Sequence, residues 1–240
     1  MVQANEANSG TTFTEGTFGT ETLPEEYLNR RANRGFEGMA LDTDEGILYA
    51  FIQTPLNNPT RADGDASSVI RMICINPETG EPVAEYIYLL QDPELGNNVD
   101  KIGDAVYAGD GKFFVMERDS SLDPTAQKFV FEVDIKGATN VLGQDFGAET
   151  LEQQTPDNLA AAGIQPVNKI KVTNLPSIGY LPSDKPEGLA ILPDGRLAVL
   201  NDNDFGLEEG AEAVQLGLID FNGDNGLDAN DQDGAINIQN

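Results

Sequence analysis

One pattern of apolar and polar positions recurs along the 240-residue chain. In its third occurrence, two apolar runs at residues 188–192 and 196–200 flank Pro193-Asp194-Gly195, and Asn201-Asp202-Asn203-Asp204 follows. An Asp-Gly between two apolar runs predicts a β-hairpin with a type I′ turn, which needs positive φ at both central residues. Because the runs are apolar at successive positions, they predict strands that are covered on both faces.

The same pattern stands at residues 35–54 and 101–119, which makes the chain a repeat protein. The copy at 101–119 aligns with residues 185–203 without a gap, and the copy at 35–54 needs one extra residue in its turn. Each hairpin is followed by further apolar runs. The strands predicted in this way lie at residues 38–41, 47–53, 69–76 and 83–90, then at 104–108, 112–117, 128–134 and 168–174, and finally in the third hairpin and at 215–221.

Two short helices are also predicted. Thr22 or Leu23 would cap the first, with Pro24 as its first helical residue. The second lies in an insertion of the middle repeat, where Thr155-Pro156 begins it and Gly163 ends it.

Recurring four-stranded antiparallel meanders indicate an all-β fold of the β-propeller type. A sandwich is the alternative, but it would not repeat the hairpin together with its flanking acids. About two and a half to three blades do not close a ring, which needs at least about four. We therefore expect the rest of the propeller to come from a longer parent chain, or from a second copy. The expected division is an N-terminal extension at 1–22, a partial propeller at 23–221 and an acidic tail at 222–240.

Charge and composition narrow the function classes. The chain has 41 Asp and Glu against 14 Lys and Arg, a net charge of −27, so nucleic acid is an unfavourable partner. Such a charge strains the compact state by self-repulsion, which bound cations would relieve. No apolar run reaches the length of a membrane span, and the first ten residues lack a signal-peptide pattern. This predicts a cytoplasmic protein, or one whose targeting segment lies elsewhere.

The chain has no histidine and a single cysteine. The first fact excludes a Ser-His-Asp triad and His-ligated zinc within this chain. The second excludes an intrachain disulfide, and Cys74, inside an apolar run, is predicted to be a buried thiol.

Acids recur at one position of the hairpin. Glu37 and Glu187 are equivalent, both beginning Glu-Gly-Met/Leu-Ala, whereas the middle repeat has Gly103 there and Asp104 one residue later. The start of a hairpin's first strand lies beside the end of its second, so these acids should meet the polar strand ends, which include Glu117-Arg118-Asp119. Oxygen ligands without His or thiolate suit Ca²⁺. The alternative is that Glu37 and Glu187 only cap backbone amides.

Arg30, Arg31 and Arg34 crowd into five positions just before the first hairpin. They predict either salt bridges on an acidic surface or an anion clamp at the mouth of a site.

Several of these motifs resemble a known family, the phytase-like propellers named for "esterase-like activity of phytase", which occur in exported bacterial proteins. The resemblance covers roughly residues 23–219. Its motifs are residues 33–40, Glu117-Arg118-Asp119, residues 185–190 and residues 201–206. It implies a propeller, export to the periplasm or the extracellular space, and a hydrolase activity, with this chain resembling the second half of such a domain.

The tail carries a separate calcium pattern. Residues 220–231 place oxygens at loop positions 1, 3, 5, 9 and 12, as EF-hand and dockerin loops do. Asn225 replaces the usual glycine at position 6, and Asn tolerates the left-handed conformation needed there. The alternative is a solvated acidic loop.

The leading functional prediction is an exported, calcium-dependent hydrolase of phosphate or other esters. The alternative is a non-catalytic propeller that is stabilised by calcium and binds a partner. The residues assigned are Glu37, Glu117, Arg118, Asp119 and Glu187 for catalysis, Arg34 and Lys185 for substrate binding, and Glu37, Asp104, Glu187, Asp202, Asp204, Asp220, Asn222, Asp224, Asp228 and Asp231 for Ca²⁺.

Overall fold

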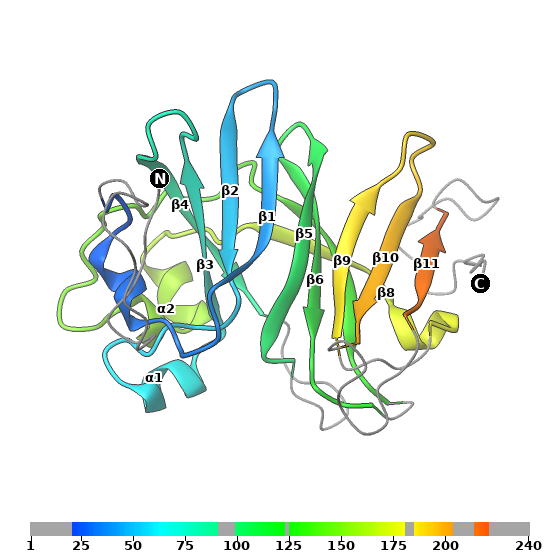
Figure 1. Cartoon of the computed structure of the whole chain (residues 1–240). Helices are drawn as coiled ribbons and strands as arrows, with labels where there is room; N and C mark the ends of the chain where they lie inside the picture. Colours follow the sequence, from blue (N-terminus) through cyan, green and yellow to red (C-terminus); the bar gives the residue numbers. More distant parts are fainter. Residues whose placement is uncertain (1–20, 91–98, 123–124, 181–184, 204–213, 221–240) are drawn as a thin grey trace, which may run out of the picture. The chain divides into compact units, whose positions relative to one another are not determined.

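The computed structural model describes residues 21–90, 99–122, 125–180, 185–203 and 214–220. The chain divides into two compact units. Unit 1 holds Met1–Leu90 and Ile135–Asn168, and unit 2 holds Gln91–Asp134 and Lys169–Asn240. The strands form three antiparallel sheets of four, four and three strands (Figure 1). The all-β prediction is therefore confirmed, while the arrangement of the sheets about one axis stays a prediction.

Unit 1 contains one four-stranded meander with its strands side by side in chain order (Figure 1). The strands are β1 (Phe36–Asp42), β2 (Ile47–Ile52), β3 (Val69–Ile75) and β4 (Pro82–Leu89). Every residue of β3 is buried, as its unbroken apolar run predicts. Exposed and buried residues alternate in β1, so its second face is open among the described residues.

The insertion that follows β7 (Lys128–Asp134) belongs to unit 1 and packs against β3 and β4 of its sheet. It carries η2 (Leu151–Gln153) and α2 (Pro156–Ala161). The predicted helix is confirmed, because Thr155 caps α2 and Gly163 adopts a left-handed φ of 71° just beyond it. The shared core consists of Val69, Ile87, Val141, Leu151, Leu159 and Ile164.

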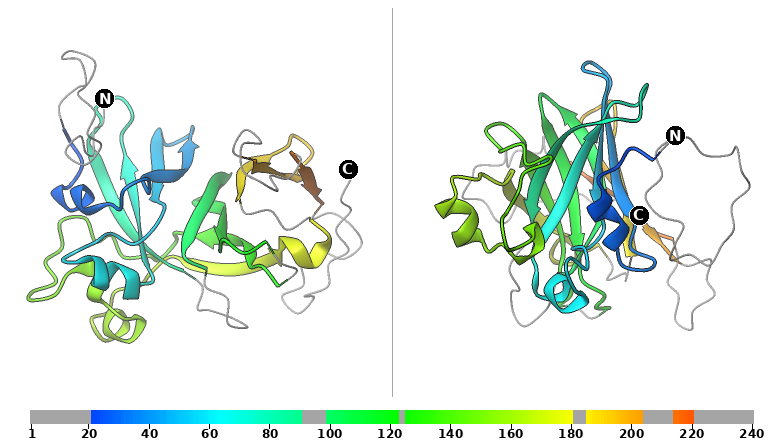
Figure 2. Two further views of the ribbon diagram at one scale, coloured as in Figure 1. Left: turned by 60° about the horizontal axis from the view of Figure 1, so that its bottom comes forward. Right: turned by 90° about the vertical axis from the view of Figure 1, so that its left-hand side faces the viewer.

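The insertion also covers the edge of β4. The backbone N–H groups of Val141 and Val167 donate to the carbonyls of Glu85 and Ile87, at 2.8 and 2.9 Å. These bonds satisfy strand-edge groups that would otherwise be open to pairing with another chain. Figure 2 shows α2 and η1 (Glu25–Asn29) beside this sheet.

Two short helices correct the sequence prediction. The first predicted helix is a 3₁₀ turn that begins after Pro24, so Pro24 precedes the helix rather than opening it. The helix α1 (Arg61–Ala66) was not predicted, although Thr60 and Asp63 form a capping box there.

Unit 2 contains two antiparallel sheets. The first comprises β5 (Lys101–Gly109), β6 (Lys112–Arg118), β7 and β8 (Asn168–Asn174), and the turn η3 (Leu175–Ile178) follows it. The second comprises β9 (Lys185–Ile191), β10 (Leu197–Asp202) and β11 (Leu216–Ile219), in the order β11-β10-β9. The two sheets share one apolar core: Met116, Val130, Leu175, Tyr180, Leu197, Val199 and Ile219.

Two details of the third hairpin were predicted wrongly. Buried and more exposed residues alternate along β10, with Leu200 42% exposed, so this strand is covered on one face only. At Asp194-Gly195 only Gly195 has positive φ, 88°, which excludes a type I′ turn. The turn instead spans residues 192–195, closed by the Gly195 N–H donating to the Leu192 carbonyl at 2.9 Å, and Asp194 accepts the Arg196 N–H at 3.2 Å. The type I′ requirement is met in the middle hairpin, where Asp110 and Gly111 have φ of 51° and 73°.

Two further predictions concern Cys74 and membrane spans. Cys74 is buried, as predicted, and burial raises the pKa of its thiol to about 12, which leaves it inert. Among the described residues, no helix has the length and apolar character needed to cross a membrane.

Candidate functional site

The three hairpins share a one-residue bulge at the same repeat position. The ladder skips one residue between Phe36 and Gly38, between Ile102 and Asp104, and between Pro186 and Gly188. The extra residues are Glu37, Gly103 and Glu187, so their predicted equivalence is confirmed. Bulges re-aim a side chain and are common beside functional sites.

Gly103 departs from the acidic pattern because β9 approaches β5 too closely for a side chain. A Cβ at Gly103 would lie 2.7 Å from the carbonyl oxygen of Pro186. The acid of this repeat stands one residue later, at Asp104. Its Oδ2 accepts the backbone N–H of Leu189 on β9 at 2.7 Å, and its Oδ1 accepts that of Ala105 at 2.7 Å.

Three basic residues form one row across the first sheet of unit 2. Lys101 is the register partner of Arg118, and Arg118 is the register partner of Lys128. Directly opposite residues share a face of an antiparallel pair, so the three side chains lie on the same face. They are only 2%, 2% and 1% exposed. We call Lys101, Arg118 and Lys128 the basic row.

Two members of the basic row pair with carboxylates. Arg118 Nη2 donates to Glu187 Oε1, which ties β6 to β9. Lys128 Nζ lies 2.8 Å from Asp119 Oδ1 and donates to the Asp119 carbonyl at 2.6 Å.

The third member, Lys101, is held by a hydroxyl as well as by an acid. Its Nζ lies 2.7 Å from both Asp100 Oδ1 and Ser120 Oγ. Buried cations that are satisfied by such bonds hold a fixed geometry.

Asp104 is the titratable group of this site. Burial raises the pKa of its carboxyl to about 6, the two backbone donors lower it in part, and the negative charge of Glu187 raises it again. A carboxyl with that pKa exchanges its proton near neutral pH. It stands beside Glu187, the acidic partner of Arg118.

Glu117 lies on the opposite face of the sheet from the basic row, because successive strand residues alternate in direction. It is fully buried and pairs with Lys169 Nζ, which sits 4.2 Å from the ring centre of Phe131. Its catalytic assignment stays a prediction, and its side chain lies on the other face of the sheet from that of Arg118.

The remaining predicted residues are outside this group. Within unit 1, Glu37 is exposed on β1, and Arg34 Nη1 donates to Gln53 Oε1 at 3.0 Å. Within unit 2, Asp202 and Lys185 are register partners at one end of the β9–β10 pair. Asp220 follows β11. The other calcium candidates lie outside the described residues: Asp204, Asn222, Asp224, Asp228 and Asp231.

The described residues do not assemble a metal site. No group of three or more His, Cys, Asp or Glu side chains within that part of the chain is placed to hold an ion. Asp104 and Glu187 do approach each other, but Asp104 accepts two backbone N–H groups and Glu187 accepts from Arg118. Calcium binding therefore stays a prediction.

Sequence reasoning missed Lys101 and Lys128. Both stand at the first position of an apolar strand, and a polar residue there carries no signal by itself. The signal that could have found them is the ladder: each is paired with Arg118, which had been singled out.

Comparison with known proteins identifies a family. The family model for phytase-like proteins, described as "Esterase-like activity of phytase", matches residues 11–205, most of the chain. No curated protein and no solved structure matches.

Proposed function

The chain belongs to the phytase-like family, and from that premise we propose that it hydrolyses esters that carry a negative charge, phosphate esters foremost. The observation that carries the proposal is the basic row. A chain with 14 basic and 41 acidic residues places three of its bases on one sheet face, buried. Cations in such a low-dielectric, preorganised setting stabilise developing negative charge more strongly than cations in water.

The residues of this site have distinct roles in the proposed reaction. The substrate anion takes the place of Glu187 on Arg118, because the Glu187 side chain is 23% exposed and can turn toward solvent. Lys101 and Arg118 then balance the charge that develops on the ester oxygens. A water molecule attacks the phosphorus or the carbonyl carbon, and the bond to the alcohol oxygen breaks. Asp104, with its pKa raised to about 6 by burial, takes the proton from the attacking water and returns it to the leaving alcohol oxygen.

Calcium, the propeller and export complete the proposal. When bound, Ca²⁺ would bridge the acidic protein to an anionic substrate and polarise the ester. The three sheets are proposed as successive blades about one axis. Membership of the family supports an extracellular or periplasmic location, and a longer parent chain would supply the remaining blades.

The test is hydrolysis of p-nitrophenyl phosphate and p-nitrophenyl acetate, with calcium or with a chelator. We expect little activity from the 240-residue chain alone and chelator-sensitive hydrolysis from a parent that completes the ring. In the active form, Arg118→Met should lower kcat/KM about 100-fold or more, as loss of one oxyanion donor does. Arg196→Met is the matched control, because Arg196 pairs with Asp194 at an exposed turn of the same unit.

Two further variants separate catalysis from structure. Asp104→Asn should remove the limb of the pH–rate profile near pH 6, a change that a purely structural role would not produce. Glu187→Gln should alter both the rate and the calcium requirement while the fold survives. If both variants leave rate and pH profile unchanged, this site is not the active site.

The alternative is a calcium-stabilised propeller that binds a partner without catalysis. It is favoured by the observation that every member of the basic row has an acidic partner, as structural ion pairs do. A parent that is inert on both esters, with and without calcium, would favour this alternative.

A further inference from the structure

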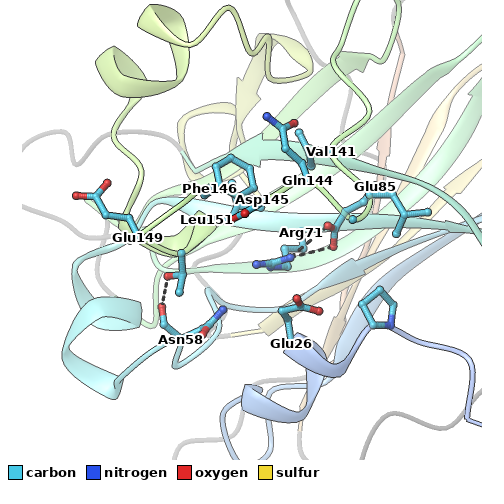
Figure 3. Close-up of a pocket in the computed structure, with 14 residues that line it drawn as sticks. Glu26, Asn58, Arg71, Glu85, Val141, Gln144, Asp145, Phe146, Glu149 and Leu151 are labelled. Carbon is cyan, nitrogen blue, oxygen red and sulfur yellow. Dashed lines mark hydrogen bonds and ion pairs between the residues drawn. The ribbon is translucent and has the colours of Figure 1, made fainter.

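Unit 1 contains a pocket that has no part in the proposed ester hydrolysis. Its volume is about 430 Å³, within the range of small-molecule sites. It is bounded by the start of η1, by β3 and β4, and by the insertion (Figure 3). One wall is apolar and consists of Val141, Phe146 and Leu151.

Arg71 and Glu85 line the floor of the pocket and belong to a buried ion triad, whose third member, Glu152, lies behind the floor and lines the adjoining pocket. Arg71, Glu85 and Glu152 are 5%, 3% and 2% exposed. Arg71 Nε and Nη2 donate to Glu152 at 2.6 and 3.1 Å, and Nη1 donates to both oxygens of Glu85 at 3.3 and 3.2 Å. All three guanidinium nitrogens are thus engaged by carboxylates. Both carboxylate partners of Arg71 are buried and, unlike the partly exposed Glu187 beside Arg118, cannot turn toward solvent to make way for an anion, so the pocket does not suit a phosphate ester.

The triad leaves an excess of buried negative charge, since two carboxylates share one guanidinium. Burial raises the pKa of Glu85, Arg71 and the Tyr27 hydroxyl lower it in part, and the charge of Glu152 raises it. Tyr27 donates to Glu85 Oε1 at 2.6 Å. With the two bonds from Arg71, this fills three of the roughly four accepting positions of the carboxylate. One position is left within the described contacts.

The rim of the pocket is acidic. Glu26, Asp145 and Glu149 line the pocket, and Arg71 is the only basic residue among the described residues that do so. Figure 3 shows Glu26, Asp145 and Glu85 around Arg71. An adjoining pocket of about 420 Å³ is lined by Glu149, Glu152 and Asp63 and by no described base.

We propose that the pocket of unit 1 binds a small organic cation, an alkylammonium whose chain packs on the apolar wall. The acidic lining residues Glu26, Asp145 and Glu149, together with the excess buried charge of the triad just behind the floor, select a positive head group. The wall of Val141, Phe146 and Leu151 selects an aliphatic chain, and the Phe146 ring adds a face that attracts cations. A metal ion fits less well, because no cluster of three ligands is present among the described residues.

The experiment is an NMR titration of the ¹⁵N-labelled full chain with n-butylammonium chloride at fixed ionic strength. n-Butanol and n-butyl phosphate serve as probes with the same chain and a neutral or negative head. We expect saturable shifts of the amide signals of residues 141–151 with n-butylammonium alone. The double variant Glu26→Gln/Asp145→Asn should weaken binding about fivefold or more, since each exposed charge pair contributes modestly.

The matched control is Glu25→Gln/Asp157→Asn. It removes the same two charges from η1 and from the insertion, but neither residue lines the pocket. Its affinity should stay within about twofold of the unaltered chain. Three results would each overturn the proposal: no saturation at about 0.1 M n-butylammonium, where exposed pairs are already screened; equal weakening by the control; or equal binding of n-butanol.

Discussion

Replacing Arg71 with methionine is the perturbation whose cost the structure defines best. Methionine keeps an unbranched apolar stem like that of arginine and removes the guanidinium. Glu85 and Glu152 would then remain buried with none of the Arg71 hydrogen bonds that they accept now. Breaking a buried ion pair by removing one partner costs about 3–5 kcal/mol of unfolding free energy.

A second route gives a similar magnitude. In the variant, protonation of Glu85 would remove one of the two buried negative charges, and the ordinary pKa of a glutamate carboxyl is 4.5. Holding it neutral at pH 7 costs about 3 kcal/mol, at about 1.4 kcal/mol per pH unit. At pH 5 the same step costs less than about 1 kcal/mol. In the variant, the pKa of the remaining carboxyl is higher in the folded state than in the unfolded state. The variant is therefore most stable at pH values below the unfolded-state pKa, and its unfolding free energy falls as pH rises.

The assay is urea unfolding followed by circular dichroism at pH 5 and pH 7. Hydrogen exchange of β3 and β4 peptides assigns the loss to unit 1, since two units need not unfold together. Arg61→Met is the control, because the Arg61 side chain is 80% exposed and lies 3.5 Å from Asp65, so its loss should stay within about 0.5 kcal/mol. A loss below about 1 kcal/mol for Arg71→Met at pH 7, or an equal loss at both pH values, would refute the reasoning.

Three further predictions rest on other features. Gly103→Ala should lower the unfolding free energy of unit 2, because the new Cβ would lie 2.7 Å from the carbonyl oxygen of Pro186 on β9. Gly137→Ala is the comparison: its Cβ would meet nothing within 4 Å, but the φ of 83° makes it a test of left-handed strain alone. Equal losses of unfolding free energy in urea for the two variants would contradict the crowding argument. Burial raises the pKa of Asp104 to about 6, so the stability that its protonated form contributes is full below pH 4 and is lost as pH rises through 6. The unfolding free energy should fall by about 2 kcal/mol over that range, once solvent screening of this partly exposed group is allowed for, and Asp104→Asn should not show the fall. Saturating calcium should raise the melting temperature by several degrees over chelator, since 100 times Kd adds about 2.7 kcal/mol, and identical melts would remove calcium from the proposed function.

The strands of this fold were predictable because their apolar runs are long and their hairpins repeat in one register. β7 and β8 begin and end where predicted, and β3 differs by one residue. The turn at Asp194-Gly195 was not predictable from its dipeptide, since the turn that forms has Pro193 and Asp194 at its centre, and Pro193 fixes a negative φ there. The capping box of α1 was readable at Thr60 and Asp63 but spans a helix of only six residues.

The candidate site was only partly predictable, because its geometry arises from pairing between strands. Arg118 and Glu187 were singled out separately, and the sequence does not show that one donates to the other. Lys101 and Lys128 enter the site only through their register with Arg118. The packing of the insertion on unit 1 was not predictable either, because it too depends on contacts between distant parts of the chain. Nothing local in residues 135–167 indicates that they pack on the sheet of the first repeat rather than on their own.

The bulge connects the stability of unit 2 with its proposed chemistry. The repeat places an acid at this position in β1 and β9, but the close approach of β9 to β5 leaves room only for Gly103. The acid one residue later, Asp104, reaches across to the Leu189 N–H, and Arg118 reaches across to Glu187. The same two contacts therefore hold the sheets together and bury the carboxyl whose pKa burial raises to about 6. Loosening the β5–β9 approach would rehydrate Asp104 and lower its pKa, so stability and proton transfer should change together in any variant that widens it.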